Sequence, residues 1–355
     1  MPYLVDITTN FPDNYYSQDN LIEKLKSVWK DKITNLNRVD SIHKNVLVRG
    51  RHLALPVEMY FNQMSFGERN NHFIKESTQL ATKAINELLE KYDLDPSDIS
   101  SLWSNTVTGF AIPSLEARVM NQINFSSKTK RVPLLGLGCM AGAAGINRCA
   151  DYLKAYPTEA VIFFSVELCS LTLQLENISV PNLVSTGLFG DGAAAVLMVG
   201  DEHPLRTSSS LKWLGSRSEF FNNTEDVMGW NVSEEGMEII LSKSVPKVTE
   251  EFLPEPLQSF LRDHGLNLSK ISSFFAHPGG PKVLQAMEKV LDLPQYGLKR
   301  SWDSLAEKGN MSSVSVLHIL QRHLEEKTND LSGTFGLSLA MGPAFSAEMG
   351  LFQWT

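Results

Sequence analysis

Residues 132–145 read Val-Pro-Leu-Leu-Gly-Leu-Gly-Cys-Met-Ala-Gly-Ala-Ala-Gly, and this segment is the strongest local signal in the sequence. Its apolar first half predicts a buried strand, and the small residues after Cys139 predict a helix that continues to Tyr156. Gly136 and Gly138 permit a tight turn between the two elements. A cysteine at the start of a helix meets free N–H groups and the positive end of the helix dipole, which favour its thiolate. The stretch therefore predicts a nucleophilic Cys139, with a buried packing cysteine as the simpler alternative.

The same alternation of strands and helices continues along the chain in both directions. Strands are expected at residues 101–107, 132–137, 161–166, 192–199, 211–215, 237–241, 271–276, 335–340 and 348–352. Helices are expected at residues 65–92, 115–122, 139–156, 245–264 (broken by prolines), 281–291 and 312–326. This pattern predicts an α/β architecture with central sheets covered by helices. The strand-to-helix unit at Cys139 recurs at His277, which indicates two related halves, residues 1–205 and 206–355, in one compact unit.

Composition and charge exclude several classes of protein. The 355 residues include 32 Lys or Arg and 40 Asp or Glu, so the net charge is −8. Hydrophobic residues make up 43% and charged residues 20%, which excludes a disordered chain. An acidic chain gives no electrostatic reason to expect nucleic acid or an anionic membrane as a partner.

The sequence also lacks the signals of secretion, membrane insertion and metal binding. No apolar run approaches the roughly 20 residues of a membrane helix, and no basic segment followed by an apolar run opens the sequence. The three cysteines, Cys139, Cys149 and Cys169, form an odd count without metal-type spacing. We expect a cytoplasmic protein with reduced thiols, no metal and no membrane insertion. Cys149 is expected to pack within a helix, and Cys169 to line a cavity.

Two further candidate residues, like Cys139, lie at the junction of two predicted elements. His277 ends the apolar run 273–276 and precedes Pro-Gly-Gly-Pro, which favours it as the base or oxyanion donor for the cysteine. Taken alone, it would more often be a structural histidine. Asn310 opens the helix expected at 312–326, where an N-cap is the simpler interpretation. The other histidines are expected to be solvated or to cap helices: His43, His52, His72, His203, His264, His318 and His323.

Four segments in this order resemble the type III polyketide synthase family, whose plant members are the chalcone and stilbene synthases. They are Gly136-Leu137-Gly138-Cys139, Leu188-Phe189-Gly190-Asp191-Gly192-Ala193-Ala194, Ala276-His277-Pro278-Gly279-Gly280-Pro281 and Gly309-Asn310-Met311-Ser312-Ser313. The resemblance implies a thiolase-like fold, in which two related βαβ halves form a layered α-β-α-β-α core, and a homodimer. It also implies Cys139, His277 and Asn310 as the catalytic triad, acting on acyl-CoA and malonyl-CoA without a cofactor.

The same resemblance assigns the cavity around the triad. It places Phe189 at an aromatic gate between CoA tunnel and cavity, with Ile239 at the second gate in place of Phe. Lining positions fall on Thr108, Cys169, Thr172, Trp230 and Ser312, and the loop that contains Gly342 and Pro343 adjoins them. Ile112 matches the residue that reaches into the partner's cavity. Lys44 matches a CoA-binding cation, and Arg38 lies nearby.

The segment Met228-Gly229-Trp230 resembles bacterial members of the family that make alkylpyrones or alkylresorcinols from fatty acyl-CoA. The sequence therefore predicts a synthase that condenses malonyl-CoA with a medium or long acyl-CoA held on Cys139. Two alternatives stay open at this point. One is a ketoacyl synthase of the fatty acid initiation type, and the other is a non-catalytic acyl-CoA-binding protein on the same fold.

Overall fold

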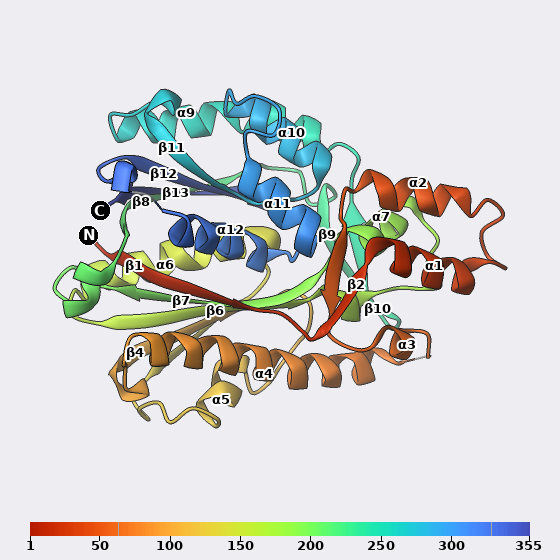
Figure 1. Cartoon of the computed structure of the whole chain (residues 1–355), viewed down its shortest axis with the longest axis horizontal. Helices are drawn as coiled ribbons and strands as arrows, with labels where there is room; N and C mark the ends of the chain where they lie inside the picture. The colour runs from red at the N-terminus through yellow and green to blue at the C-terminus, as the bar shows by residue number, and fades with distance from the viewer. Residues whose placement is uncertain (63, 328) are drawn as a thin grey trace.

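The computed structural model describes residues 1–62, 64–327 and 329–355, and its centre is a nine-stranded mixed sheet (Figure 1). From one edge to the other, the strands are β11 (Ile271–Ala276), β12 (Phe335–Gly342), β13 (Ser346–Trp354), β8 (Leu211–Phe220), β1 (Tyr3–Asn10), β7 (Asp191–Val199), β6 (Ala160–Leu168), β4 (Ile99–Asn105) and β5 (Lys130–Leu134). The α/β class predicted from the alternation of strands and helices is confirmed.

Strand β1 lies in the middle of the sheet and joins its two sides. Seven residue pairs connect β1 to β7, but only two, Tyr3 with Lys212 and Leu4 with Leu211, connect it to β8. Strands β4 to β7 lie on one side of this junction, and β8 with β11 to β13 lie on the other. The boundary predicted between two related halves, at residue 205, stays a prediction.

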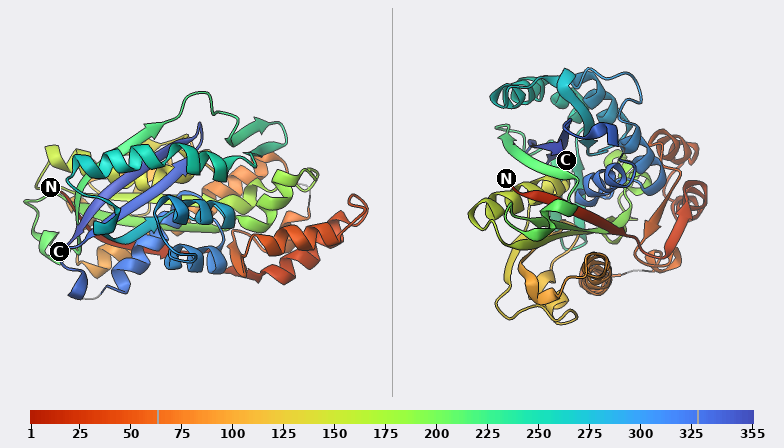
Figure 2. Two further views of the ribbon diagram at one scale, coloured as in Figure 1. Left: turned by 90° about the horizontal axis from the view of Figure 1, so that it is seen from above. Right: turned by 60° about the vertical axis from the view of Figure 1, so that its left-hand side comes forward.

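Helices fill the space between the two sides of the sheet and cover both outer faces. They are α4 (Phe66–Lys91), α5 (Leu115–Met120), α6 (Ala141–Ala155), α8 (Val245–Phe252), α9 (Pro254–Asp263), α10 (Pro281–Val290), α11 (Lys299–Lys308) and α12 (Ser313–Glu325). Helices α6 and α12 lie between the strands of the two sides (Figure 1). Helices α4 and α5 cover one outer face, and α9 and α10 the other; the turned view shows α4 end-on beneath its strands (Figure 2). The layered α-β-α-β-α arrangement expected from the sequence is confirmed.

A lobe of shorter elements covers one end of these layers, at the right of Figure 1. It consists of β2 (Asn14–Ser17), α1 (Gln18–Trp29), α2 (Asn37–Asn45), β3 (Gly50–Leu53), α3 (Val57–Tyr60), α7 (Val180–Leu188), β9 (Met228–Ser233) and β10 (Gly236–Leu241). Strands β9 and β10 form a separate antiparallel hairpin outside the main sheet. None of these elements except β10 was predicted from the sequence.

The long helix α4 shows how the sequence sets its own boundaries. Its start is fixed by a capping box, in which Ser65 Oγ accepts from Glu68 N and Glu68 Oε2 accepts from Ser65 N. Phe73, Ala84 and Leu88 follow at helical spacing and are fully buried. The helix predicted at 65–92 is therefore observed at 66–91. No helix in the described part of the chain has both the length and the apolar character needed to cross a bilayer.

Helix α6 is built from small residues because other elements approach it closely. A Cβ at Gly142 would lie 2.1 Å from the carbonyl oxygen of Ser313 in α12. A Cβ at Gly145 would lie 2.2 Å from the ring of Phe163 in β6. Both distances are far below van der Waals contact, so Gly142 permits the packing of α6 against α12 and Gly145 its packing against β6.

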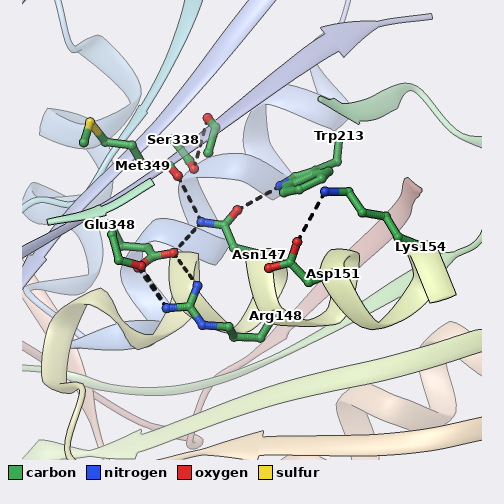
Figure 3. A network of polar contacts seen from close by, with 10 residues as sticks. Asn147, Arg148, Asp151, Lys154, Trp213, Ser338, Glu348 and Met349 are labelled. Atoms are coloured by element: carbon green, nitrogen blue, oxygen red, sulfur yellow. Dashed lines mark hydrogen bonds and ion pairs between the residues drawn. The ribbon is translucent and has the colours of Figure 1, made fainter. Parts of the chain in front are cut away.

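Polar contacts tie the middle of α6 to the C-terminal strands (Figure 3). Asn147 Nδ2 donates to Glu348 Oε1 (2.7 Å) and to the Met349 carbonyl (3.1 Å), and Trp213 Nε1 donates to Asn147 Oδ1 (2.9 Å). Arg148 pairs with the fully buried Glu348 carboxylate at 2.9 Å. These contacts hold α6, and the turn that precedes it, against strands β8 and β13.

Candidate active site

Cys139 lies in a tight turn between β5 and α6. The chain turns through Gly136 (φ +85°) and Gly138 (φ +55°), both in the left-handed region, and a short 3-10 turn over 138–140 precedes α6. A Cβ at Gly138 would lie 2.3 Å from Pro343 Cδ, so the loop before β13 packs directly on this turn. Gly142 belongs to the first turn of α6, close to α12. The glycines therefore fix the thiol at the junction of the two sides of the molecule.

His277 directly follows β11 and is 2% exposed. Its main-chain N–H donates to the Leu339 carbonyl (2.9 Å), which holds the residue against β12. Both ring nitrogens are buried, and neither has a hydrogen-bond partner in the described part of the chain. Buried polar groups in proteins are nearly always satisfied, so an imidazole left with two free nitrogens is unusual. It is available to bind a substrate or to move a proton.

Asn310 is held in place by both its main chain and its side chain. Its N–H donates to the Leu188 carbonyl (2.9 Å), and its carbonyl accepts from Gly190 N (3.1 Å). Its Oδ1 accepts from Ser312 N (2.8 Å), while Nδ2 has one long contact, to the Gly279 carbonyl (3.4 Å). The acceptor is thus used to open α12, and the amide N–H groups remain available to a ligand.

The three side chains share one buried cavity, as the sequence resemblance implies. Cys139, His277 and Asn310 line it together with Phe189, Ser312 and Pro343. Apolar side chains form most of the remaining wall: Val107, Leu188, Met228, Trp230, Ile239, Leu241, Val245, Val283 and Met341. A cavity with few polar groups among apolar walls is typical of a site that binds a small molecule and excludes water.

Burial acts against the charge state predicted for Cys139 and its histidine partner. Burial raises the pKa of the Cys139 thiol to about 11, and the nearby Glu167 carboxylate adds to the rise. The Ser312 hydroxyl, 3.5 Å from Sγ, opposes the shift but does not cancel it. Burial also lowers the pKa of His277 to about 3. Burial therefore opposes the thiolate that the start of a helix favours, and it also opposes a charged imidazole at His277. The thiolate predicted for Cys139 stays a prediction.

The comparisons with known proteins identify the family. The family described as "FAE1/Type III polyketide synthase-like protein" matches residues 17–260, and "Chalcone and stilbene synthases, C-terminal domain" matches residues 214–353. The 1,3,6,8-tetrahydroxynaphthalene synthase of Streptomyces peucetius subsp. caesius is 38% identical, over 98% of this chain and 92% of that protein. This chain belongs to the type III polyketide synthase family. It is therefore an enzyme of the acyltransferase class.

Two further comparisons bear on fold and chemistry. A crystal structure of 1,3,6,8-tetrahydroxynaphthalene synthase from Streptomyces coelicolor A3(2) superimposes with a TM-score of 0.92 and 29% identity, covering 99% of each chain. The thiolase-like fold implied by the sequence is thereby confirmed. An α-pyrone synthesis polyketide synthase-like protein of Mycobacterium tuberculosis H37Rv is 25% identical over 98% of this chain and 90% of its own. Family membership favours a polyketide synthase over both alternatives left open by the sequence.

A second cavity of this type III polyketide synthase adjoins the first, inside the lobe. Four residues border both cavities: Cys169, Phe189, Trp230 and Ile239. The rest of its wall comes mainly from α1, β3, α3, α7 and the 3-10 turn after β6, which contains Thr172. The structure therefore places the two predicted gate residues, Phe189 and Ile239, between two chambers.

The remaining predicted site residues do not line the triad cavity. Thr108 and Thr172 line a small third cavity beside Arg69. Gly342 packs behind Pro343, where a Cβ would lie 2.5 Å from the Leu137 carbonyl oxygen. Ile112 is 98% exposed on the surface. Lys44 and Arg38 are exposed on α2 and border neither the triad cavity nor the chamber next to it.

Glu167 is a site residue that the sequence reasoning missed. It ends the buried strand β6, is fully buried, and accepts hydrogen bonds from Thr108 Oγ1 (2.9 Å), Val107 N (3.1 Å) and the Ser313 hydroxyl. Burial raises its pKa to about 7, against these hydrogen bonds. A carboxylate at the end of a nine-residue apolar strand was the available signal. In the described part of the chain, no group of three His, Cys, Asp or Glu is arranged to hold a metal ion.

Proposed function

We propose that this enzyme condenses malonyl-CoA with an acyl group held as a thioester on Cys139. The observation that carries the proposal is the shared cavity, in which the thiol lies with an imidazole that has two free nitrogens and with the amide of Asn310. A thiol, a neutral base and two hydrogen-bond donors are the groups that thioester exchange and enolate stabilisation require.

In the loading step, a ring nitrogen of His277 takes the Cys139 proton as the sulfur attacks the thioester carbon of the acyl-CoA. Because burial disfavours the charged form of both groups, we expect the proton to move as the sulfur attacks. CoA leaves as its thiol and takes the proton back from His277. The acyl group remains on Cys139.

In the condensing step, His277 and the Asn310 amide donate hydrogen bonds to the thioester oxygen of malonyl-CoA. These bonds stabilise the enolate that forms when CO2 leaves, and each such donor contributes about 2.7–4 kcal/mol in comparable oxyanion sites. The enolate carbon attacks the carbonyl of the Cys139 acyl thioester, and the new chain leaves Cys139 as a CoA thioester two carbons longer. No metal or organic cofactor takes part in these steps.

Asn310→Ala separates the two steps. We expect CO2 release from malonyl-CoA to fall by about 100-fold or more, because one oxyanion donor is lost. Loading of Cys139, followed as a mass increase of the intact protein with an acyl-CoA, should be retained. The Cys139→Ala variant is the matched control and should not load. Normal CO2 release by Asn310→Ala would exclude the proposed role.

For the starter, we propose a medium or long acyl-CoA and a product of the alkylpyrone or alkylresorcinol type. The support is the apolar wall beside the triad, with the aliphatic Ile239 opposite Trp230, and the similarity to the α-pyrone protein. The second candidate is a naphthalene product from malonyl-CoA alone, which the higher identity to the tetrahydroxynaphthalene synthase favours. Labelled malonyl-CoA, with and without a panel of acyl-CoA starters, distinguishes them: a product formed without starter supports the second candidate.

For the CoA group, we propose that the exposed cations of α2 bind its phosphates. Lys44→Ala should raise KM for malonyl-CoA while kcat changes little, because only substrate binding is weakened.

We further propose that the enzyme is a homodimer, with Ile112 in the contact between subunits.

A further inference from the structure

Two of the four residues that border both cavities belong to the β9–β10 hairpin. Trp230 in β9 and Ile239 in β10 are directly opposite each other in the hairpin register, so both side chains lie on one face. Both residues border the triad cavity and the second cavity. The position of the hairpin therefore sets part of the wall between the two chambers, which Cys169 and Phe189 complete.

The hairpin is not part of the main sheet, so other contacts must fix its position. Its turn is held by Arg69 of α4, whose Nη2 donates to the Glu235 carbonyl and whose Nη1 donates to the Leu173 carbonyl (2.8 Å). Gln174, which is buried, donates through Nε2 to the carbonyls of Glu235 (3.3 Å) and Met237 (3.4 Å). The side chains of Arg69 and Gln174 thus both donate hydrogen bonds to the main chain of the same turn.

The conformation of this turn lets both side chains approach its main chain closely. Gly236 has φ +122°, a conformation that L side chains rarely adopt. A Cβ there would lie 3.0 Å from Arg69 Nη2 and 3.1 Å from Gln174 Nε2. The guanidinium is half-buried, and burial lowers its pKa. Its charge is directed at main-chain carbonyls, which makes these hydrogen bonds charge-assisted.

The adjacent residue on α4 holds a second segment near the site. Asn70 Nδ2 donates to the Phe110 carbonyl (2.9 Å), and Phe110 N donates to Asn70 Oδ1 (2.8 Å). The first turns of α4, fixed by their capping box, therefore position both the hairpin and the loop around residue 110. Arg69 and Asn70 couple these two segments to the rigid outer helix.

We propose that Arg69, together with Gln174, is a positioning residue that clamps the hairpin so that Trp230 and Ile239 close the second cavity off from the triad. The clamp limits the length of the acyl chain that Cys139 accepts and extends, an inference that rests on the proposed function. Releasing the clamp joins the two chambers and makes room for a longer chain.

The first test compares kcat/KM for a short and a long acyl-CoA starter in wild type, Arg69→Ala, Arg69→Lys and Lys75→Ala. We expect Arg69→Ala to raise the long-to-short ratio about tenfold, the scale on which a pocket discriminates a few methylenes. Arg69→Lys, which keeps a charged donor, should return most of the way to wild type. Lys75→Ala removes an exposed cation from the same helix and should leave the ratio unchanged. An unchanged ratio in Arg69→Ala overturns the proposal.

The second test needs no turnover, so it separates the clamp from the proposed function. Cys169 is 5% exposed in the wall between the chambers, and its alkylation by iodoacetamide can be mapped by mass spectrometry in a Cys139→Ala background. We expect Arg69→Ala to raise the rate of Cys169 alkylation several-fold, with no change for Lys75→Ala. An unchanged rate contradicts the clamp even if polyketides form. A raised rate supports it even if no condensation is found.

Gln174→Ala keeps the proposal testable if Arg69→Ala does not fold. It removes the two longer hydrogen bonds and leaves those of Arg69 in place. We expect the same direction of change in starter preference and in Cys169 alkylation, at a smaller size. No change in either measurement counts against the clamp.

Discussion

The reactivity of Cys139 depends on two opposing effects at its sulfur. The start of a helix favours an anion by about 0.3–1 kcal/mol at an exposed site. Burial among apolar walls acts the other way, and the pKa of about 11 shows that it is the larger effect. His277, with a pKa of about 3, remains an acceptor of protons throughout the neutral range. Burial thus disfavours both charges of a thiolate–imidazolium pair at this site.

This charge state predicts the pH profile of Cys139 alkylation. Because the thiol pKa is raised, the thiolate fraction at pH 7 is small and grows about tenfold per pH unit. The rate of modification by iodoacetamide should therefore keep rising from pH 7 to 10. The measurement uses a variant in which Cys149 and Cys169 are replaced by Ala, so that only Cys139 reacts. A rate that levels off below pH 8 would indicate a resting thiolate paired with imidazolium.

Glu167 should make the stability of the enzyme fall as the pH rises through neutrality. Its pKa is raised from 4.5 to about 7, so the folded state binds a proton that the unfolded chain releases. This contribution is fully present below pH 4.5 and is lost as the pH passes 7, an effect on the order of 3 kcal/mol. Glu167→Gln removes it. The melting temperature of Glu167→Gln, relative to that of wild type, should rise between pH 5 and pH 8. If the difference between the two melting temperatures stays constant over this range, the assignment is contradicted.

Helix α6 connects the nucleophile to the C-terminal strands, and this link has a measurable strength. Arg148→Met leaves the buried Glu348 carboxylate without its cation, although Asn147 and Ser218 still donate to it. We expect the free energy of unfolding in urea to fall by about 1–3 kcal/mol. Lys154→Ala breaks an exposed pair on the same helix and should change it by less than about 1 kcal/mol. Equal changes in the free energy of unfolding for the two variants would mean that the buried pair contributes no more to stability than the exposed one.

Elements with a strong local pattern could be predicted, and elements that depend on distant partners could not. The apolar strands β6, β7 and β11 and the capped helix α4 lie within a few residues of their predicted positions. The lobe was missed because β2 and β3 have only four residues each and pair across more than thirty residues of chain. Three histidines expected to be solvated or to cap helices are buried instead: His43, His318 and His323. His43 contacts the Leu183 carbonyl and His318 contacts Ser304, partners that no local pattern reveals.

The site shows the same division. Cys139, His277 and Asn310 each follow a strand end or open a helix, so glycines and apolar runs marked their positions. No local pattern indicated Glu167 or Arg69, because their roles depend on tertiary contacts with residues distant in the sequence. The charge state of Cys139 also depends on burial by the whole molecule rather than on its own turn.

At the scale of the molecule, the triad lies where the two sides of the sheet meet. Cys139 comes from the side of β4 to β7, and His277 from the side of β8 and β11 to β13. The contact of Gly142 with Ser313 fixes the distance between α6 and α12, and hence between Cys139 and Asn310. The lobe then closes the cavity. The three triad residues come from distant parts of the sequence and meet only in the folded molecule. No short segment therefore contains the whole site.

The loop around residue 110 is the surface on which we expect two copies of the enzyme to associate. Ile112 is 98% exposed and Phe110 is 41% exposed, although the neighbouring Thr108 is buried beside Glu167. Large apolar side chains so exposed on a loop that Asn70 holds in place are typical of an interaction surface. We expect a homodimer in sedimentation velocity at micromolar concentration. Ile112→Asp should shift it towards monomer, because burying a carboxylate in the contact is unfavourable.

The matched control is Ile178→Asp, which places the same charge at another exposed isoleucine, 44% exposed, between the 3-10 turn after β6 and α7. It should leave the dimer intact. If the dimer contact also completes the cavity, as the resemblance implies for Ile112, the monomeric variant should still load Cys139 but give an altered set of products. A monomeric wild type, or a dimer that Ile112→Asp leaves unchanged, would remove this loop from the interface. Loading without any change in products would confine Ile112 to the contact between subunits, outside the chemistry of the cavity.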